Sequence, residues 1–260
     1  MDGPASKRGS SMRKKLSENL TRVRERIGEA AAKVGREPQR VTLVAVTKAV
    51  DPETIRALIE LGQLDLGESR GPQLIQRAAV IEEHLSRRAM LEQDKGLAMP
   101  RWHMVGHLQR NKVKPLIPAV SMIHSVDTLR LAEEVNAQAG KVDRRMDVLV
   151  QVNCAGESQK YGMPVAAAGH FIEQVMPLSR LRVRGLMCMA PLVDDPEKAR
   201  PVFERLYELF LEIKMTYRLG RDFEHLSMGM SQDYHVAVEC GATMVRVGSA
   251  LFEGLETAGV

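Results

Sequence analysis

The sequence predicts an α/β protein folded as a single (β/α)8 barrel, a TIM barrel, with an extra helix at its amino end. Eight short apolar runs with strand character alternate with stretches of helical period along the chain. No break in composition is long enough to be a linker, and 260 residues suit one large α/β domain. A doubly wound open sheet is the alternative, because periodicity alone does not show whether a sheet closes.

The amino-terminal part predicts a disordered tail followed by the extra helix. Residues 1–10 are basic and rich in small residues, and they lack the apolar core of a secretory signal. We therefore expect a tail over residues 1–10 and one domain over residues 11–260. A helix is expected over residues 12–35, with Gly35 as its stop. Its apolar stripe consists of Leu16, Leu20, Val23, Ile27 and Val34.

The strand-like runs are rich in apolar and β-branched residues, as in strands buried on both faces. They are residues 41–48, 64–68, 102–106, 122–126, 148–153, 182–189, 224–228 and 244–248. Because each run is bounded by turn-forming or polar residues, helices are expected between most of them.

Three segments between the strands carry helix signals. Asp51-Pro52 gives an N-cap followed by a proline at the first helical position. Residues 128–139 and 202–217 have helical period. The longer segment 70–99 predicts a helix that gives way to a polar surface loop, which contains SRRAMLEQDKGLAMP.

Composition and cysteine use are those of an ordinary soluble protein. Apolar residues make up 44% of the chain and charged residues 27%, and no apolar run reaches the length of a transmembrane helix. Cys154, Cys188 and Cys240 are widely spaced, which favours a reducing cytosol and argues against a zinc site. The net charge of +4 lies largely in the tail and in Lys112 and Lys114. We expect a cytoplasmic protein with no metal, nucleic-acid or membrane partner.

The most informative run is VTLVAVTK, a nearly unbroken apolar strand that ends on Lys48. The carboxyl ends of parallel strands are where α/β barrels place their chemistry. Partial burial at such a mouth disfavours the ammonium form, lowers the lysine pKa and frees an amine that can form a Schiff base. On position alone, a strand-end lysine that reaches into water is the commoner case.

Two turns of small residues predict a phosphate site. The last strand ends in Gly248-Ser249, and the strand before it ends in SMGMS, residues 227–231. Backbone N–H groups and hydroxyls in such turns bind phosphate after the last two strands of many barrels. One Gly-Ser turn is commonly only a turn, but the pair favours phosphate binding.

Arg246 lies two residues before Gly248, so the two point the same way along an alternating strand. That direction is the barrel interior if Val245 and Val247 face the helices. A buried arginine needs an acceptor, which a ligand or an internal ion pair, for example with Glu68, would supply.

Other polar residues near the strand ends have open roles. Glu68 is a candidate ligand contact or an ion-pair partner for Lys48 or Arg246. Asn153 ends the fifth strand and suits a hydrogen bond to a ring or a carbonyl, or a turn cap. His103 and His107 lie four residues apart within a strand, so helical metal-ligand spacing does not apply and structural roles are expected.

Nine ordered motifs between residues 45 and 252 belong to a family resemblance that runs from about Met12 to Gly254. They are AVTK (45–48), GES (67–69), WHMVGHLQRNK (102–112), HSVD (124–127), QVN (151–153), KYG (160–162), RGLMCMAP (184–191), LSMGMSQD (226–233) and MVRVGSALF (244–252). With these motifs the chain resembles the pyridoxal phosphate homeostasis protein family. The resemblance implies a single barrel like the N-terminal domain of bacterial alanine racemase, of fold type III. It also implies that pyridoxal 5′-phosphate (PLP) is held as a Schiff base on Lys48.

The resemblance further implies which residues surround the cofactor. They are Asn153, Ser227, Arg246, Gly248 and Ser249. Ser227, Gly248 and Ser249 fall at the phosphate, and Arg246 falls near the phosphate or the pyridine nitrogen. Two departures from the family pattern affect the end of the second strand. Ser69 replaces the asparagine of Gly-Glu-Asn, and residues 70–73 replace a stretch that usually carries Val-Gln-Glu.

We expect a carrier of PLP rather than an enzyme. Racemases of this fold draw a second acid–base group from another domain or subunit, whereas here the barrel fills the chain. An arginine facing the pyridine nitrogen would keep it unprotonated and weaken the ring as an electron sink. We therefore expect no catalytic residues, a monomer, and transfer of PLP to apo PLP-dependent enzymes.

Two alternatives remain for the function. The first is a weak amino-acid racemase or a related PLP enzyme. The second is a phosphate-binding barrel or interaction protein without PLP, which would require an inert Lys48. If another lysine carries the cofactor, Lys160 is the next candidate, because it lies just beyond the fifth strand.

Overall fold

The fold is a closed barrel of parallel strands surrounded by helices. The computed structural model describes residues 4–92, 98–157 and 161–255. The barrel wall consists of β1 (Thr42–Val46), β2 (Asp65–Glu68), β3 (Arg101–Met104), β4 (Met122–Val126), β5 (Met146–Asn153), β7 (Leu181–Met187), β8 (His225–Ser227) and β9 (Met244–Val247). Neighbouring strands pair in parallel, and the pairing of β4 with β5 closes the ring. This closure confirms the predicted (β/α)8 barrel and excludes the open sheet.

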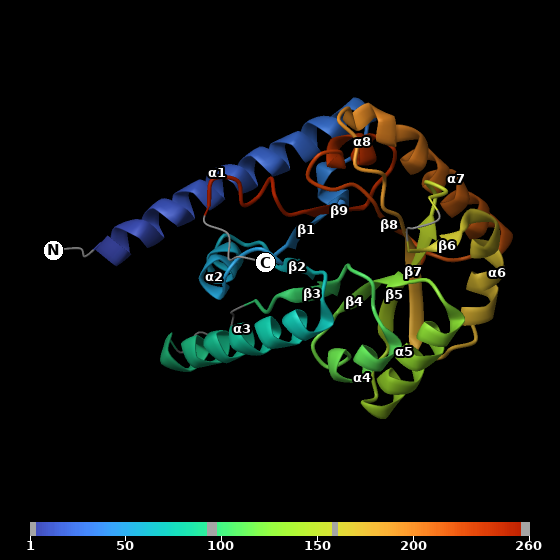
Figure 1. Cartoon of the computed structure of the whole chain (residues 1–260), viewed down its shortest axis with the longest axis horizontal. Helices are drawn as coiled ribbons and strands as arrows, with labels where there is room; N and C mark the ends of the chain where they lie inside the picture. The colour runs from blue at the N-terminus through green and yellow to red at the C-terminus, as the bar shows by residue number, and fades with distance from the viewer. Residues whose placement is uncertain (1–3, 93–97, 158–160, 256–260) are drawn as a thin grey trace.

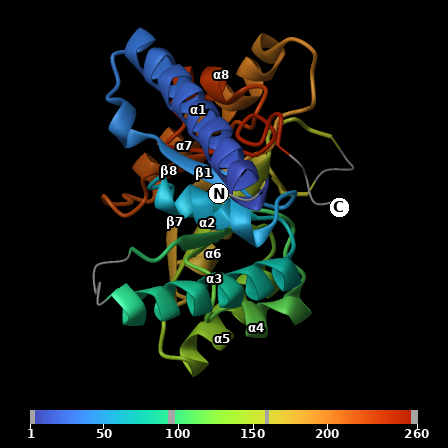
Figure 2. The same cartoon turned by 90° about the vertical axis from the view of Figure 1, so that its left-hand side faces the viewer.

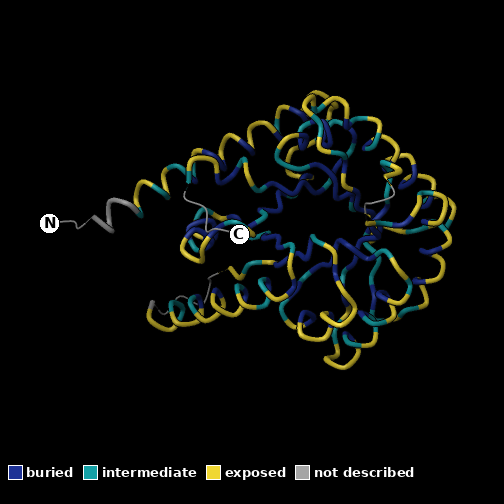
Figure 3. The backbone as a smooth tube through the Cα atoms, in the orientation of Figure 1, coloured by how far each residue is buried: buried dark blue, intermediate teal, exposed yellow. Residues whose placement is uncertain are grey.

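Helices cover the outside of the ring (Figure 1). They are α1 (Pro4–Lys33), α2 (Pro52–Glu60), α3 (Gly71–Glu92), α4 (Val113–Leu116), α5 (Leu129–Lys141), α6 (Val165–Val175), α7 (Arg200–Thr216) and α8 (Tyr234–Glu239). Figure 3 shows the buried backbone gathered on the inner ring and the exposed backbone on the outer surface. Asp51 caps α2 as predicted, because its carboxylate accepts the N–H of Thr54 at 2.8 Å. The periods over 128–139 and 202–217 correspond to α5 and α7.

Two separate apolar cores stabilise the barrel. The large core joins the outward faces of the strands to the helices. A small buried cluster of four side chains from four different strands stands apart from it: Met122, Leu149, Met187 and Met244. Met122 and Met244 lie two residues before the buried His124 and Arg246, so these side chains share the inner face of the barrel. The interior is therefore apolar at one level and polar at the next.

The first helix is longer than the sequence predicts. Helix α1 begins at Pro4, so most of the expected disordered tail over residues 1–10 is helical. It ends at Lys33, which leaves Val34 outside the helix and 44% exposed. The buried Asn19 fixes α1 to the carboxyl-terminal turn by donating to the carbonyls of Leu251 and Glu253 at 2.9 and 3.0 Å. Figure 2 shows α1, α2 and α3 side by side on one flank of the barrel.

Three other boundaries differ from the expectation. Helix α3 continues to Glu92, so the first part of the expected loop is helical. The short strand β6 (Met163–Pro164), which pairs with β5, was not predicted. Strand β1 ends at Val46, two residues earlier than expected. None of the helices in the described ranges combines the length and apolarity that crossing a bilayer requires.

Candidate functional site

The barrel brings the lysine turn and the last strand together at one mouth. Strand β1 pairs with β9 so that Ala45 lies beside Val247. One residue further along, Gly248 lies against Val46: a Cβ on Gly248 would be 3.2 Å from the Val46 carbonyl oxygen. The turn that carries Lys48 and the turn that carries Ser249 therefore begin next to each other.

Lys48 is exposed in the turn after β1, so the expectation of partial burial is wrong. The cause is the early end of β1, which places Lys48 two residues outside the barrel wall. The backbone of this turn is nevertheless fixed. Arg77 of α3 donates hydrogen bonds to the carbonyls of Thr47, Lys48 and Val50.

Glu68 is the partner of Arg77, not of Lys48 or Arg246. Its carboxylate is 1% exposed and also accepts the N–H of Ser69 at 2.8 Å. A buried carboxylate needs such a cationic partner. Arg77 escaped the sequence analysis because nothing in the helix marks it. The signal that could have found it was the buried Glu68 at the end of a strand.

Arg246 points into the barrel, as the alternation of its strand predicts. It is 5% exposed, and its two terminal nitrogens donate to the Ser227 hydroxyl at 2.6 Å and to the Cys188 carbonyl at 2.9 Å. Burial lowers the pKa of Arg246 from its ordinary value, whereas Cys188 and Asp233 act to raise it.

A chain of hydrogen bonds continues from Ser227 through the barrel interior. The Ser227 hydroxyl lies 2.9 Å from Nδ1 of His124, and Nε2 of His124 lies 2.9 Å from Nδ1 of His103. Nε2 of His103 lies 3.0 Å from a carboxylate oxygen of Asp65. We call this chain, from Arg246 through Ser227, His124 and His103 to Asp65, the interior relay. His103 is thus structural, as expected.

The carboxylate at the end of the relay fixes the direction of one hydrogen bond. Ionised Asp65 only accepts, so Nε2 of His103 carries the hydrogen between them. Burial, together with the nearby His103 and Arg246, lowers the pKa of His124 well below its usual value, which keeps it neutral. Burial raises the pKa of Asp65, but hydrogen bonds from His103 and Arg101 outweigh it and set the pKa at about 2.

The relay has a consequence for Ser227. Its hydroxyl oxygen accepts from Arg246, and the same hydroxyl lies within hydrogen-bond distance of Nδ1 of His124. The hydroxyl therefore helps to orient Arg246 from within the barrel. A direct contact between Ser227 and phosphate stays a prediction.

The two small-residue turns meet through Ser231. Its hydroxyl accepts the N–H groups of Gly248 and Ala250 at 3.1 and 3.3 Å. Asp233 holds the other end of this loop by accepting the N–H of Met230 at 2.6 Å. Gly229 has a φ of +90°, and a Cβ there would lie 2.6 Å from the Cβ of Ala237. The sequence did not predict this role of Ser231 as an acceptor between the two turns.

Ser249 and Asn153 lie at the same end of the barrel. Ser249 is exposed in the turn after β9. Asn153 ends β5, and its amide nitrogen donates to the Glu157 carbonyl at 2.8 Å. The amide oxygen of Asn153 is buried without a hydrogen-bond partner in the described part of the chain. Such an acceptor suits a hydroxyl or N–H group of a ligand. Lys160 lies outside the described residues.

A stacked pair of aromatic rings lies beyond the ends of β3 and β5. The rings of His107 and Tyr161 are nearly parallel, with centroids 3.9 Å apart. Burial raises the pKa of the nearby Asp127, against the opposing charge interaction with His107. These groups add ionisable side chains to the mouth that the sequence analysis did not single out.

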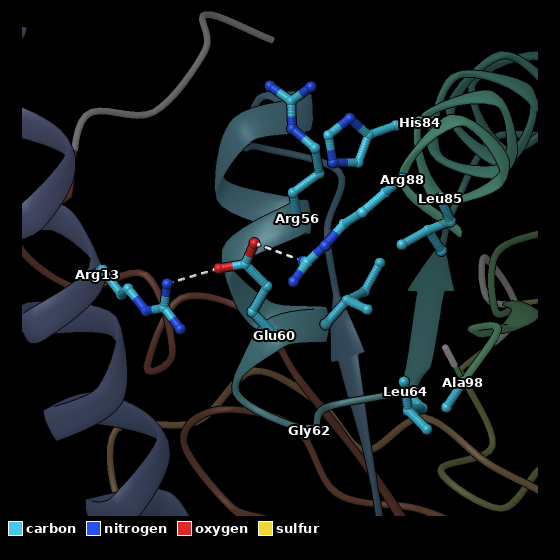
Figure 4. Close-up of a pocket in the computed structure, with 10 residues that line it drawn as sticks. Arg13, Arg56, Glu60, Gly62, Leu64, His84, Leu85, Arg88 and Ala98 are labelled. Atoms are coloured by element: carbon cyan, nitrogen blue, oxygen red, sulfur yellow. Dashed lines mark hydrogen bonds and ion pairs between the residues drawn. The ribbon is translucent and has the colours of Figure 1, made fainter. Parts of the chain in front are cut away.

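A separate pocket opens near the amino ends of β2 and β3 (Figure 4). Glu60 lies at its centre and pairs with Arg13 at 2.7 Å and with Arg88 at 3.2 Å. Leu64 and Ala98, which precede β2 and β3, lie at its edge. Residues at the amino ends of barrel strands generally contribute to stability, whereas catalytic and binding residues lie at the carboxyl ends. We therefore do not count the pocket as part of the candidate site.

Comparison with known proteins shows which proteins the chain resembles over most of its length. The model of the alanine racemase N-terminal domain matches residues 14–256. The pyridoxal phosphate homeostasis protein of Aquifex aeolicus is 39% identical over 235 residues, which are 90% of this chain and 96% of that protein. That of Escherichia coli K12 is 32% identical over 237 residues, covering 91% and 95%.

Solved structures give the same result. PipY of Synechococcus elongatus PCC7942, solved with PLP bound, is 30% identical with a TM-score of 0.75, covering 91% of this chain and 99% of that one. An alanine racemase of Clostridium difficile 630, at 14% identity and a TM-score of 0.66, shares the fold over 59% of its own length. The chain therefore belongs to the alanine racemase N-terminal domain family and, within it, to the pyridoxal phosphate homeostasis proteins.

Proposed function

We propose that this protein binds PLP at the carboxyl mouth of the barrel and carries it, with the cofactor held as a Schiff base on Lys48. The observation that carries the proposal is the adjacency of two turns. One bears a primary amine at Lys48, and the other offers the converging N–H groups of Gly248 and Ala250. An amine next to an anion-binding turn suits a ligand that has both an aldehyde and a phosphate.

The polar groups at the mouth fit the remaining parts of PLP. Two N–H groups converge on the Ser231 hydroxyl oxygen, and a phosphate oxygen, an acceptor of the same kind, would take the place of that hydroxyl. Arg246 is held with its donors at the inner side of the mouth. The unpartnered amide oxygen of Asn153 would accept from a ring hydroxyl. When bound, PLP supplies the aldehyde that condenses with an amine and releases water.

The exposure of Lys48 favours a carrier over a tight prosthetic site. A lysine side chain that is exposed to solvent can be reached by a second amine. Exchange of that kind would allow PLP to leave for an apo-enzyme. The relatives named pyridoxal phosphate homeostasis protein, and PipY with PLP bound, support the same role.

We further propose that the protein has no catalytic role of its own. The guanidinium of Arg246 has donors only, so beside the pyridine nitrogen it would leave that nitrogen unprotonated. One observation favours the alternative of a weak racemase. His107, Tyr161 and Asp127 place ionisable groups at the same mouth, and one of them could act as a second acid or base.

The first experiment is the visible spectrum of the purified protein with PLP. Schiff-base absorbance that borohydride removes, with the reduced adduct mapped to Lys48 by peptide mass, would support the proposal. An adduct on Lys160 would refute the role of Lys48. The absence of any adduct would favour the barrel without PLP.

The second experiment separates carrier from enzyme. The PLP-loaded protein is mixed with an apo PLP-enzyme, and the recovered activity of that enzyme reports transfer. Racemisation of alanine, serine and lysine is followed in parallel by chiral chromatography. Transfer without turnover is expected, whereas racemisation on the order of 1 s⁻¹ or faster would favour the racemase.

The same proposal includes a monomer that acts in the cytoplasm, where apo PLP-enzymes are available. All three cysteines are free, which is usual for proteins of reducing compartments. Light scattering of the purified protein, and fractionation of cells that express it, test the two statements.

A further inference from the structure

Two cysteines follow neighbouring strands at the mouth of the barrel. Cys154 comes directly after β5, and Cys188 comes directly after β7. The two strands pair in parallel with Gln151 beside Met187, and Figure 1 shows them next to each other. Both thiols are free, and they hydrogen-bond to each other.

The environments of the two thiols differ in a way that suits stepwise oxidation. Cys154 is partly exposed, and the hydrogen bond from Cys188 lowers its pKa from the usual value, with help from the charge of Arg205. Cys188 is fully buried, and its pKa is raised by the hydrogen bond to Cys154 and by burial. A thiolate that solvent can reach, next to a protonated partner, is the arrangement of an attacking and a resolving cysteine.

We propose that Cys154 and Cys188 form a reversible redox pair, which a hydroperoxide converts to a disulfide that loosens the hold of the site on PLP. The Cys154 thiolate attacks one peroxide oxygen, the O–O bond breaks, and the departing oxygen leaves as water after taking a proton. The Cys188 sulfur then loses its proton and attacks the resulting sulfenic sulfur. The S–O bond breaks, and a second water leaves. Two thiols and one hydrogen peroxide thus give one disulfide and two waters.

The link from the disulfide to PLP runs through the backbone of Cys188. Its carbonyl accepts a hydrogen bond of 2.9 Å from one terminal nitrogen of the buried Arg246 guanidinium. A disulfide requires a narrow range of Cα separations and a dihedral angle of about 90° around the S–S bond. A shift of Cys188 that meets this requirement also moves its carbonyl, which is one of the acceptors that orient Arg246. This effect on PLP rests on the proposed function, whereas formation of the disulfide does not.

Cys240 supplies a matched control within the same chain. It lies at the end of α8, where its sulfur contacts Arg200 at 3.6 Å. Burial raises the pKa of its thiol to about 11. Cys240 should therefore react slowly with peroxide, and its replacement should leave the redox pair intact.

The test treats the full chain with hydrogen peroxide or with dithiothreitol, in the presence and absence of PLP. Peptide mass spectrometry without reduction locates the disulfide, and fluorescence titration gives the dissociation constant for PLP. The wild type and Cys240→Ser should form the link between Cys154 and Cys188. Their dissociation constant should rise about tenfold on oxidation, the loss expected for one charge-assisted hydrogen bond. Dithiothreitol should reverse both changes.

The variants Cys154→Ser and Cys188→Ala should show no link and no peroxide-dependent change in PLP affinity. Cys154→Ser alters a partly exposed side chain, so it keeps the test valid if Cys188→Ala does not fold. Absence of the link in the oxidised wild type, or equal oxidation of Cys240, would overturn the proposal. A link with unchanged PLP affinity would overturn its effect on the cofactor. If the reduced wild type binds no PLP while the link still forms, the proposed function fails and the redox pair stands.

Discussion

Arg246 donates a hydrogen bond of 2.6 Å to the hydroxyl of Ser227, and both side chains are buried inside the barrel. His124 holds the same hydroxyl at 2.9 Å from another strand. The protein itself therefore orients the guanidinium. A ligand that meets a donor already in place loses less entropy on binding than one that must order it.

Replacement of Lys48 by alanine should abolish the covalent adduct with PLP and leave the fold intact. The side chain is exposed, so its loss removes little packing and should change the free energy of unfolding by less than about 0.5 kcal/mol. Absorbance after borohydride reduction and a urea melt measure the two effects. Lys141→Ala, which removes an exposed lysine at the end of α5, is the control and should keep the adduct.

Arg246→Ala should weaken PLP binding more than Ser249→Ala does. A charge-assisted hydrogen bond in a partly dry site is worth roughly twice a neutral one. Ser249 is exposed, and the N–H groups of Gly248 and Ala250 survive its replacement. Dissociation constants for PLP from fluorescence titration test the order. Equal constants for the wild type and Arg246→Ala would assign the arginine a purely structural role.

Arg77→Ala should destabilise the protein and loosen the lysine turn together. It leaves the buried Glu68 carboxylate without its cation and removes the hydrogen bonds to the carbonyls of Thr47, Lys48 and Val50. Loss of one partner of a buried ion pair costs about 3 kcal/mol in unfolding free energy. Urea denaturation measures the stability, and the rate of adduct formation with PLP reports on the turn.

The matched control for Arg77 is Arg87→Ala on the same helix. Arg87 pairs with Glu83 on the exposed surface, with its side chain 74% exposed. Exposed pairs of this spacing contribute roughly 0.5 kcal/mol or less. If both variants lost the same stability, Glu68 would not depend on Arg77.

The order of the strands along the chain and the polar residues near their ends could be predicted from local patterns. The lysine after β1, the paired turns after β8 and β9, and the inward direction of Arg246 are all visible in apolar runs and their terminal residues. The interior relay was not visible, because His124 and Ser227 are 103 residues apart and meet only when the barrel closes. The exposure of Lys48 was misjudged because a strand end is uncertain by one or two residues.

The early start of α1 and the roles of Arg77 and Ser231 were not predicted, for related reasons. Composition favours disorder near the amino end, but helix α1 continues to Pro4. Arg77 and Ser231 contact backbone groups of other segments, and such contacts leave no period in the sequence. Side chains that hydrogen-bond to the backbone of segments distant in sequence are therefore the part of a site that a single sequence predicts least.

Two groups of the interior relay, His124 and Asp65, set the pH dependence of stability in different pH ranges. The folded barrel keeps His124 neutral below its usual pKa of 6.5, whereas the unfolded chain gains a proton there. Stability should therefore fall as the pH drops below about 6.5. Asp65 has a folded pKa of about 2 against 3.8 in the unfolded chain. Its contribution is present above pH 3.8 and is lost as the pH falls toward 2, by about 2 kcal/mol.

Two variants separate these ranges in urea melts recorded between about pH 7 and about pH 3. His124→Gln keeps hydrogen-bonding groups but cannot take up the proton, so the loss of stability that begins near pH 6.5 should shrink. Asp65→Asn should reduce only the loss below pH 3.8. His170→Gln, at an exposed position of α6 outside the relay, is the control substitution. If His124→Gln has the same pH slope as the wild type above pH 3.8, neutral His124 does not link the relay to stability.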